Sequence, residues 1–333
     1  MNNFDKAASL IKEAHHIAII QAENPDGDSL GSALALEEIL GDLGKKVSLY
    51  CPVDIPKYLR YAHGWDRVSD KLATDADTYI VVDTASKTLM EKALVPENLA
   101  QFKKKPVIVI DHHVTEGDLP FDYVLMAEEK AIATSEIIYD FAIANKWDIT
   151  TQAAENIMLA ILSDSLGLSS EATTAKGVRV MADLIDLGAH PSELDIRRKE
   201  FMKKSPEILA YKGRLIERVE YHLAGQLALV HIPWDEISKY SDQYNPSMLV
   251  LDEMRLVKGV RLAIALKTYP DGKITGKIRA NSDAKVAEKV AAYFGGGGHP
   301  FAAGFRIYEE YDATLNELLG ATDKIIKDYD ATT

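Results

Sequence analysis

Short apolar runs alternate with longer amphipathic segments through the first part of the chain. The runs are typical of buried strands in a parallel sheet, and they cover residues 17–20, 47–50, 79–82 and 107–110. Apolar spacing of three and four residues predicts helices over residues 29–43, 133–145, 151–162 and 174–187. This alternation predicts an α/β domain in which helices flank a mostly parallel sheet.

The pattern changes after residue 190. Residues 194–218 are charge-rich and helical by periodicity, and hairpin-like apolar runs follow at residues 226–232, 260–268 and 273–279. Pro270-Asp271-Gly272 is a turn between the last two runs. We therefore expect a first domain over residues 1–190, a helical linker over 191–218, and a smaller α+β domain over 219–333, with a cleft between the domains.

Composition limits the classes of protein to consider. The chain has 333 residues, 47% of them hydrophobic, which is enough for two cores. The single Cys51 excludes an internal disulfide, and no apolar run approaches the length of a membrane span, so we expect a cytoplasmic protein with no membrane partner. A net charge of −13 argues against tight binding of long or duplex nucleic acid, whereas a small nucleotide stays compatible.

Candidate chemistry begins with Asp111-His112-His113, which directly follows the run at 107–110. Carboxylates lie in similar positions at other apolar runs, namely Asp26, Asp28, Asp83 and Asp164. A single Asp after a strand is usually a turn former or a helix N-cap. Because the carboxyl ends of parallel strands share one edge of a sheet, we expect this set to converge there with the two imidazoles.

Such a set suits two divalent cations. The pair Asp26 and Asp28 could direct one carboxylate at each ion, and Asp83 could bridge them. An imidazole ligand favours Mn²⁺, Fe²⁺ or Zn²⁺, whereas Mg²⁺ and Ca²⁺ prefer sites made only of oxygens. Two ions about 3.5–4 Å apart are a recurrent device for phosphoester hydrolysis, which is therefore the favoured chemistry.

A second candidate site lies near the end of the chain, at four consecutive glycines followed by His299. The backbone N–H groups of Gly296, Gly297 and Gly298, together with the imidazole of His299, could hold a phosphate. Arg279 is a candidate for a further phosphate contact, since guanidinium binds phosphate in a bidentate manner. The alternatives are a plain strand–helix connection for the glycines and a surface ion pair for the arginine.

These motifs together resemble the DHH phosphoesterase family. The matching segments are Asn24–Ser32, Asp83-Thr84, Asp111-His112-His113 and Ser163-Asp164-Ser165, and residues 295–305 resemble the DHH-associated C-terminal domain. The most similar subgroup comprises the compact NrnA-like nanoRNases and 3′-phosphoadenosine 5′-phosphate (pAp) phosphatases. The resemblance covers nearly the whole chain.

The resemblance implies roles for individual residues. It implies two Mn²⁺ ions, with Mg²⁺ or another divalent ion as the alternative, bound by Asp26, Asp28, Asp83, His112 and Asp164. It also implies that His113 stabilises charge on the phosphate, and we expect Asp111 to orient His112. Members of the family usually carry a metal-binding His where this chain has Ala22, so the first metal site is expected to be weak unless Gln21 or Glu23 supplies a ligand.

The expected function is hydrolysis of very short oligonucleotides or dinucleotides to mononucleotides, with pAp phosphatase activity as a second reaction. One alternative is another hydrolase of the same chemistry: a single-strand exonuclease, a cyclic-dinucleotide hydrolase or a pyrophosphatase. The other is a nucleotide-binding regulator whose first metal site has decayed at Ala22. The sequence leaves a homodimer open.

Overall fold

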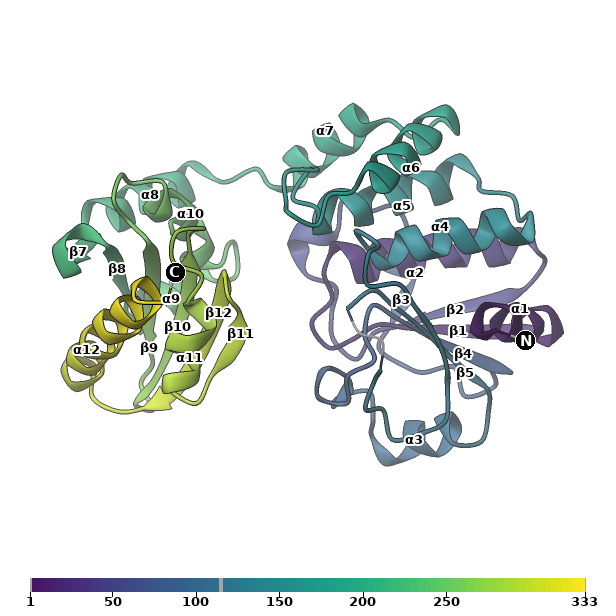
Figure 1. Ribbon diagram of the computed structural model, residues 1–333, viewed down its shortest axis with the longest axis horizontal. Helices are drawn as coiled ribbons and strands as arrows, with labels where there is room; N and C mark the ends of the chain where they lie inside the picture. The colour runs from purple at the N-terminus through teal and green to yellow at the C-terminus, as the bar shows by residue number, and fades with distance from the viewer. Residues whose placement is uncertain (1, 114–115, 333) are drawn as a thin grey trace. The chain divides into compact units, whose positions relative to one another are not determined.

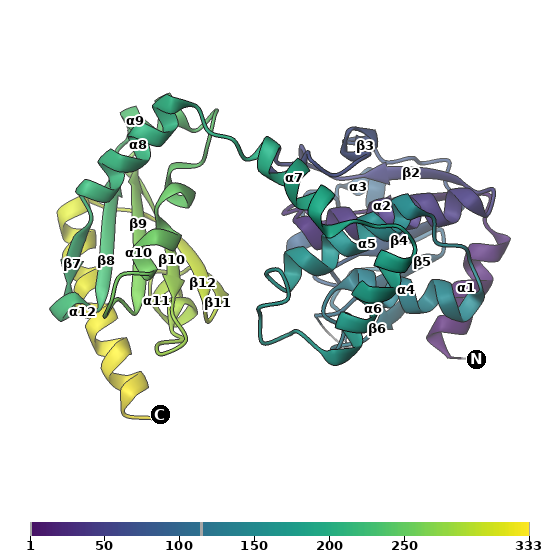
Figure 2. The same cartoon turned by 90° about the horizontal axis from the view of Figure 1, so that it is seen from above.

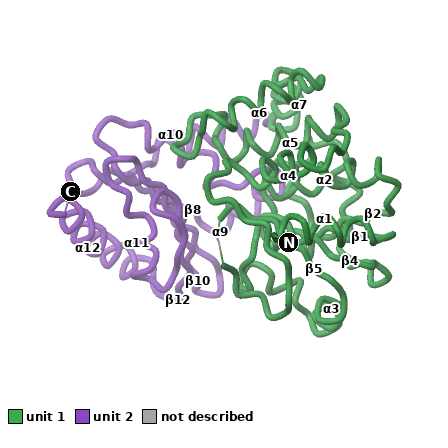
Figure 3. Tube along the Cα trace, turned by 45° about the vertical axis from the view of Figure 1, so that its right-hand side comes forward, with its two compact units in different colours: residues 1–203 green, residues 204–333 purple. Residues whose placement is uncertain are grey.

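The computed structural model describes residues 2–113 and 116–332. The chain folds into two compact units, residues 1–203 and residues 204–333, which are coloured separately in Figure 3. The division falls inside the segment expected as a linker. Helix α7 (Pro191–Phe201) belongs to the first unit and buries Leu194 in its core, whereas α8 (Pro206–Glu217) packs in the second unit.

The first unit is built on a six-stranded sheet in the order β3-β2-β1-β4-β5-β6, and every neighbouring pair is parallel. The strands are β1 (His16–Ile20), β2 (Lys46–Tyr50), β3 (Val68–Ser69), β4 (Thr78–Val82), β5 (Val107–Asp111) and β6 (Val124–Ala127). The predicted parallel α/β domain is confirmed. Since β1, β4 and β5 are adjacent at its centre, the segments that follow them begin at one edge of the sheet.

Helices cover both faces of this sheet. Figure 1 shows α2, α4, α5 and α6 gathered on one side and α3 on the other, and in Figure 2, seen from above, α5 and α6 lie nearer the viewer than α3. The helices of the unit are α1 (Asn3–Glu13), α2 (Gly27–Asp42), α3 (Pro96–Phe102), α4 (Thr134–Asn145), α5 (Thr151–Asp164), α6 (Ala175–Asp186) and α7. Separate apolar cores lie on the two faces, so the sheet is buried on both sides.

Close packing of α2 against α5 positions two of the candidate ligands. A Cβ atom on Gly31 would lie 2.6 Å from the carbonyl oxygen of Asn156, and one on Gly27 would lie 2.2 Å from Oγ of Ser163. Only glycine permits this approach. The start of α2, which carries Asp28, therefore meets the end of α5, which carries Asp164.

The second unit holds a six-stranded sheet in the order β11-β12-β10-β9-β8-β7. Its strands are β7 (Glu220–His222), β8 (Leu227–Ile232), β9 (Leu262–Thr268), β10 (Lys273–Ala280), β11 (Gly297–His299) and β12 (Ala302–Tyr308). Strands β9 and β10 form the predicted hairpin, but β8 and β9 are parallel. β8 is antiparallel to β7, as a hairpin-like run predicts, but it runs parallel to β9 because the helices between them provide a crossover.

Helices also lie on both faces of this second sheet. They are α8, α9 (Trp234–Tyr240), α10 (Leu251–Arg255), α11 (Ala287–Tyr293) and α12 (Tyr311–Asp330). One core contains residues of α11 and α12, and the other contains residues of α8, α9 and α10. Among the residues that the structure describes, no helix is both long enough and apolar enough to cross a bilayer.

Candidate metal centre

Two groups of side chains in the first unit could each hold a metal ion. One consists of Asp28, His112 and Asp164, and the other of Asp83, His112 and His113. Within each group the potential ligand atoms all lie within 4.8 Å of one another. Four of the five residues expected as metal ligands are thus brought together, with His112 shared between the groups.

The ends of β4 and β5 place Asp83 and His112 side by side. The backbone N–H of Asp83 donates to the carbonyl of Ile110 at 2.8 Å, which continues the pairing of the two strands by one residue. Asp83 has φ = 65°, in the left-handed region that a non-glycine residue adopts only at a cost. The chain turns sharply there, and its carboxylate oxygen lies 3.8 Å from Nε2 of His112.

The imidazole of His112 is arranged as a metal ligand. Its Nδ1 donates to the carbonyl of Ala131 at 3.2 Å, which leaves Nε2 with a lone pair. Nε2 is buried without a hydrogen bond, although carboxylate oxygens of Asp164, Asp28 and Asp83 lie 3.3, 3.6 and 3.8 Å from it. A buried polar atom without a partner costs free energy, and a cation among these oxygens would remove that cost.

The start of α4 fixes the carboxylates. Asp28 is only 1% exposed, and its oxygens accept the backbone N–H groups of Thr134 at 2.7 Å and Ser135 at 3.3 Å. The hydroxyl of Thr134 donates to Oδ1 of Asp83 at 3.0 Å. Sequence reasoning missed Thr134, and the available signal was a Thr-Ser pair at a helix start, where backbone N–H groups are free to bind anions.

Burial, together with the crowding of carboxylates, raises the pKa values of two of them. Burial raises the pKa of Asp83 well above its usual range, and the charges of Asp28 and Asp26 add to the effect. Burial followed by repulsion from Asp28 raises the pKa of Asp164 to about 6. Metal ions at this site would neutralise the negative charge of the carboxylates and favour their ionised form.

The expectation for Asp111 needs a correction. Its Oδ1 accepts both the backbone N–H of His113 at 3.0 Å and Nδ1 of the same residue at 2.9 Å, so it orients His113 rather than His112. Asp111 is the last residue of β5, and its carboxylate is placed to accept these N–H groups. This hydrogen bond is the largest cause of a raised pKa for His113.

Asp26 lies outside both groups. Its Oδ1 accepts the N–H of Ser29 at 3.0 Å and caps α2, as an N-terminal Asp commonly does. Near Ala22, the carboxylate of Glu23 accepts the N–H of Lys92 at 2.8 Å. Gln21 is fully buried, and its amide has no hydrogen-bond partner in the described part of the chain.

The expected phosphate site lies in the second unit. His299 pairs with Ala302 across β11 and β12, and Ala302 pairs with Arg279 across β12 and β10, so the imidazole and the guanidinium occupy one row of the sheet. The expectation for Gly296 needs a correction, because its backbone N–H donates to the carbonyl of Ala291 at 2.9 Å and is not free for a phosphate. Gly296 and Gly298 have a steric role, because Cβ atoms there would lie 2.2 and 2.6 Å from carbonyl oxygens of β12. A Cβ on Gly297 would meet nothing within 4 Å.

Two lysines that sequence reasoning missed lie on the same face as Arg279. Lys277 follows the alternation of β10, and Thr275 of that strand is directly opposite Lys267 of β9. Lys267 is 8% exposed and donates to Oδ1 of Asn245 at 2.8 Å, and burial lowers its pKa to about 8. Burial also lowers the pKa of Lys277. Together with Arg279, these two lysines place several cationic groups on one face of the sheet.

Comparison with known families identifies both parts of the chain. Residues 16–161 match the model of the DHH family, N-terminal domain, and residues 243–328 match the model of the DHHA1 domain. These ranges contain all of the candidate metal residues except Asp164, together with the candidate phosphate residues.

Relatives are similar over most of the chain. The bifunctional oligoribonuclease and PAP phosphatase NrnA of Thermus thermophilus is 28% identical over 84% of this chain and 81% of its own. The protein of the same name from Bacillus subtilis is 26% identical over 88% of this chain and 90% of its own. An exopolyphosphatase-related protein from Bacteroides fragilis has the same fold, with a TM-score of 0.85 and 20% identity over 99% of this chain and 97% of its own.

Proposed function

We propose that this chain, which belongs to the DHH family and carries a DHHA1 domain, is a metal-dependent phosphodiesterase that hydrolyses very short oligonucleotides or dinucleotides to mononucleotides. We further propose that it acts on pAp. The observation that supports the reaction best is the buried, unpartnered Nε2 of His112 among three carboxylates. The names of the NrnA relatives support the choice of substrate.

Asp28, Asp83, His112 and Asp164 would hold the ions, and we propose Asp26 as a further ligand on the strength of the family resemblance. Mn²⁺ is the proposed metal, since imidazole and carboxylate suit it and a relative from Enterococcus faecalis is named a probable manganese-dependent pyrophosphatase. Bound ions would activate water and neutralise charge on the phosphoryl oxygens.

His113 would act on the substrate directly. Its side chain is half exposed, and the hydrogen bond from its Nδ1 to Asp111 leaves Nε2 free to face a ligand. The carboxylate of Asp111 raises the pKa of His113, which favours the imidazolium form. We propose that this imidazolium donates Nε2–H to a phosphoryl oxygen and stabilises the negative charge that develops there.

The second unit would bind a phosphate of the substrate. We propose that Arg279, His299 and the backbone N–H groups of Gly297 and Gly298 hold a phosphate, because Arg279 and His299 share one row of the sheet. The net charge of −13 supports a small substrate over a long nucleic acid. A cytoplasmic location stays a prediction.

The alternatives differ in substrate or in turnover. A RecJ-like exonuclease would prefer a long single strand; a pyrophosphatase or a cyclic-dinucleotide hydrolase would prefer its own ligand. A regulator would bind nucleotide without turnover. The regulator is disfavoured because Asp28, Asp83, His112 and Asp164 are all present and meet in space.

A single hydrolysis screen tests the proposal. The Mn²⁺-supplemented protein is offered a dinucleotide, a five-nucleotide RNA, a long single strand, pAp, a cyclic dinucleotide and pyrophosphate. We expect the fastest turnover on the two short linear RNAs, with pAp also hydrolysed. A preference for the long strand or for pyrophosphate would replace the proposal with one of the other hydrolases, and binding without turnover would favour the regulator.

A further inference from the structure

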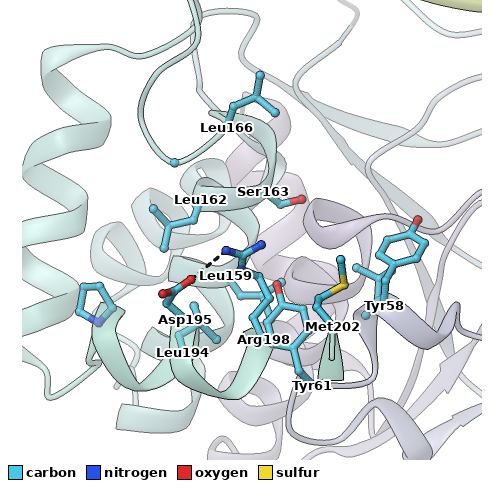
Figure 4. A pocket seen from close by; sticks show the side chains of 13 residues that line it. Tyr58, Tyr61, Leu159, Leu162, Ser163, Leu166, Leu194, Asp195, Arg198 and Met202 are labelled. Carbon is cyan, nitrogen blue, oxygen red and sulfur yellow. Dashed lines mark hydrogen bonds and ion pairs between the residues drawn. The ribbon is translucent and has the colours of Figure 1, made fainter. Parts of the chain in front are cut away.

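An apolar pocket of about 630 Å³ lies in the first unit (Figure 4). Its wall combines three segments: the 3₁₀ turn at Lys57–Leu59 and the residues after it, the end of α5 with the loop that follows, and α7 with Met202. The volume lies within the range of pockets that bind small molecules. All of its lining residues belong to one unit.

The pocket adjoins the metal centre at the end of α5. The last turn of α5 contributes Leu162 and Ser163 to the pocket, and the next residue, Asp164, belongs to a metal-binding group. The side chain of Ser163 packs against the start of α2, because a Cβ atom on Gly27 would lie 2.2 Å from its Oγ, and Gly27 stands between Asp26 and Asp28. Ser163 therefore lies both in the pocket wall and beside the turn that carries these two carboxylates.

The lining favours a flat, largely apolar ring with a few polar edges. Tyrosine rings and aliphatic side chains form most of the wall, as Figure 4 shows for Tyr58, Leu162 and Met202. The polar groups are the hydroxyls of Ser163, Tyr58 and Tyr61, the carboxylate of Asp195, and the guanidinium of Arg198, which donates through Nη2 to Asp195 at 2.8 Å. A guanidinium has further donors that could reach ring nitrogen or oxygen atoms of a ligand.

The loop after α5 holds an exposed leucine at the pocket under backbone strain. Leu166, Gly167 and Leu168 have φ values of 52°, 71° and 66°, all in the left-handed region. Leu166 lines the pocket and is 72% exposed. An exposed leucine side chain contributes little burial to stability, and leucine disfavours the left-handed backbone conformation. The stability of the fold therefore does not explain why a leucine is present at this position. Contact with a ligand would explain it.

We propose that this pocket binds the nucleobase of the nucleotide whose phosphate lies at the metal centre. This inference rests on the proposed function in taking a nucleotide as the substrate. The base would lie against the tyrosine and leucine side chains, and its edge would face Ser163 and Arg198. Because stacking on apolar and aromatic groups tolerates every base, the site would favour nucleotides over other phosphates without strict base selection.

Binding of AMP and of ribose 5-phosphate to the Mn²⁺-loaded wild-type protein tests the proposal, because ribose 5-phosphate carries a hydroxyl group at C1′ where AMP carries the base. Stacking of one base predicts that AMP binds roughly five- to a hundredfold more tightly. Equal affinities, or no binding of either ligand, would overturn the inference. The outcome is independent of hydrolysis, so failure of the proposed reaction and failure of this site are separable.

Variants locate the effect. Leu166→Asn removes the hydrocarbon and suits a left-handed backbone better, so it should weaken AMP binding, leave ribose 5-phosphate binding unchanged and raise the unfolding temperature. Tyr58→Ala should also weaken only AMP binding. Ile196→Asn and Tyr221→Ala are matched controls, since both residues are similarly exposed and lie outside the pocket.

The combination of lower affinity and higher stability at Leu166 distinguishes a binding role from a structural one. An unchanged AMP to ribose 5-phosphate ratio in both pocket variants would contradict the proposal. A change in sedimentation of these variants without a change in that ratio would instead identify the pocket as a contact between copies of the chain.

Discussion

Nε2 of His112 and Oδ2 of Asp164 lie 3.3 Å apart, although one residue follows β5 and the other ends α5. The packing of α5 against α2, with glycine at the contact points, places Asp164 near Asp28, whose carboxylate oxygen lies 3.6 Å from the same Nε2. Nδ1 of His112 carries the ring proton and donates it to a backbone carbonyl, so Nε2 can only accept a hydrogen bond. The carboxylate of Asp164 is also an acceptor, and the two atoms therefore cannot hydrogen-bond to each other. Two such groups are stable together when a cation lies between them.

Thr134→Val tests the support of the carboxylates. The change keeps the shape of the side chain and removes the 3.0 Å hydrogen bond to Asp83. Loss of such a supporting contact typically weakens metal binding by about 10–100-fold. Calorimetric titration with Mn²⁺ measures the change. Thr322→Val is the control, since that hydroxyl is also buried but has no hydrogen bond in the described chain; an unaltered affinity in Thr134→Val would show that the contact is dispensable.

The raised pKa of Asp164 predicts how the stability of the metal-free protein changes with pH. Its folded pKa of about 6 exceeds the ordinary 3.8, so the native state holds more protons between these values. The contribution of Asp164 to the free energy of unfolding therefore falls as the pH rises from about 4 to 7. Asp164→Asn should be more stable than the metal-free wild type near pH 8, by about 1–3 kcal/mol.

Denaturant unfolding measures the free energy of unfolding of the wild type and of Asp164→Asn with and without Mn²⁺. Added Mn²⁺ should stabilise the wild type more than the Asn variant, because the variant lacks the carboxylate that would bind the ion. A metal-free variant that is less stable than the wild type at high pH would contradict the role given to this carboxylate.

His299→Ala tests whether the second unit binds substrate while the first unit binds the metal ions. We expect weaker substrate binding and slower turnover with metal content unchanged, because His299 lies in the second unit and the metal groups lie in the first. Michaelis parameters and metal analysis of the purified variant provide the test. A loss of bound metal would be inconsistent with this division.

Ala22→His tests the departure from the family pattern. A methyl group cannot coordinate, and the carboxylate of Glu23 is engaged with Lys92, so one ion should bind the wild type distinctly more weakly than the other. Imidazole at this position should tighten the weaker site and lower the Mn²⁺ concentration needed for half-maximal rate. Two equally tight sites in the wild type would mean that another group, such as the unpartnered amide of Gln21, already serves.

The sequence predicted the frame of the site well. Strand ends marked Asp83 and Asp111, and a buried apolar helix marked Asp164, because hydrophobic periodicity reports which segments are buried and where they end. The same logic anticipated that Asp28 and His112 would meet.

Contacts that depend on rotamers and on packing were beyond this reasoning. Asp111 and His112 are neighbours in sequence, yet Asp111 turns to His113, and the partner of His112 is the carbonyl of Ala131. Thr134 enters the site from a helix that carries no motif. In the second unit, the pairing of β8 with β9 depends on the intervening helices, which local periodicity does not report.

Release of mononucleotide from a 5′-phosphorylated dinucleotide, followed as Mn²⁺ is added to the metal-stripped protein, tests the central claim most directly. Asp83→Asn is the matched variant, because Asn keeps the shape and tolerates the left-handed backbone. We predict no turnover before metal is added, turnover that rises with Mn²⁺ in the wild type, and loss of nearly all of it in the variant. Turnover in the metal-stripped protein, or full activity of Asp83→Asn, would contradict the account.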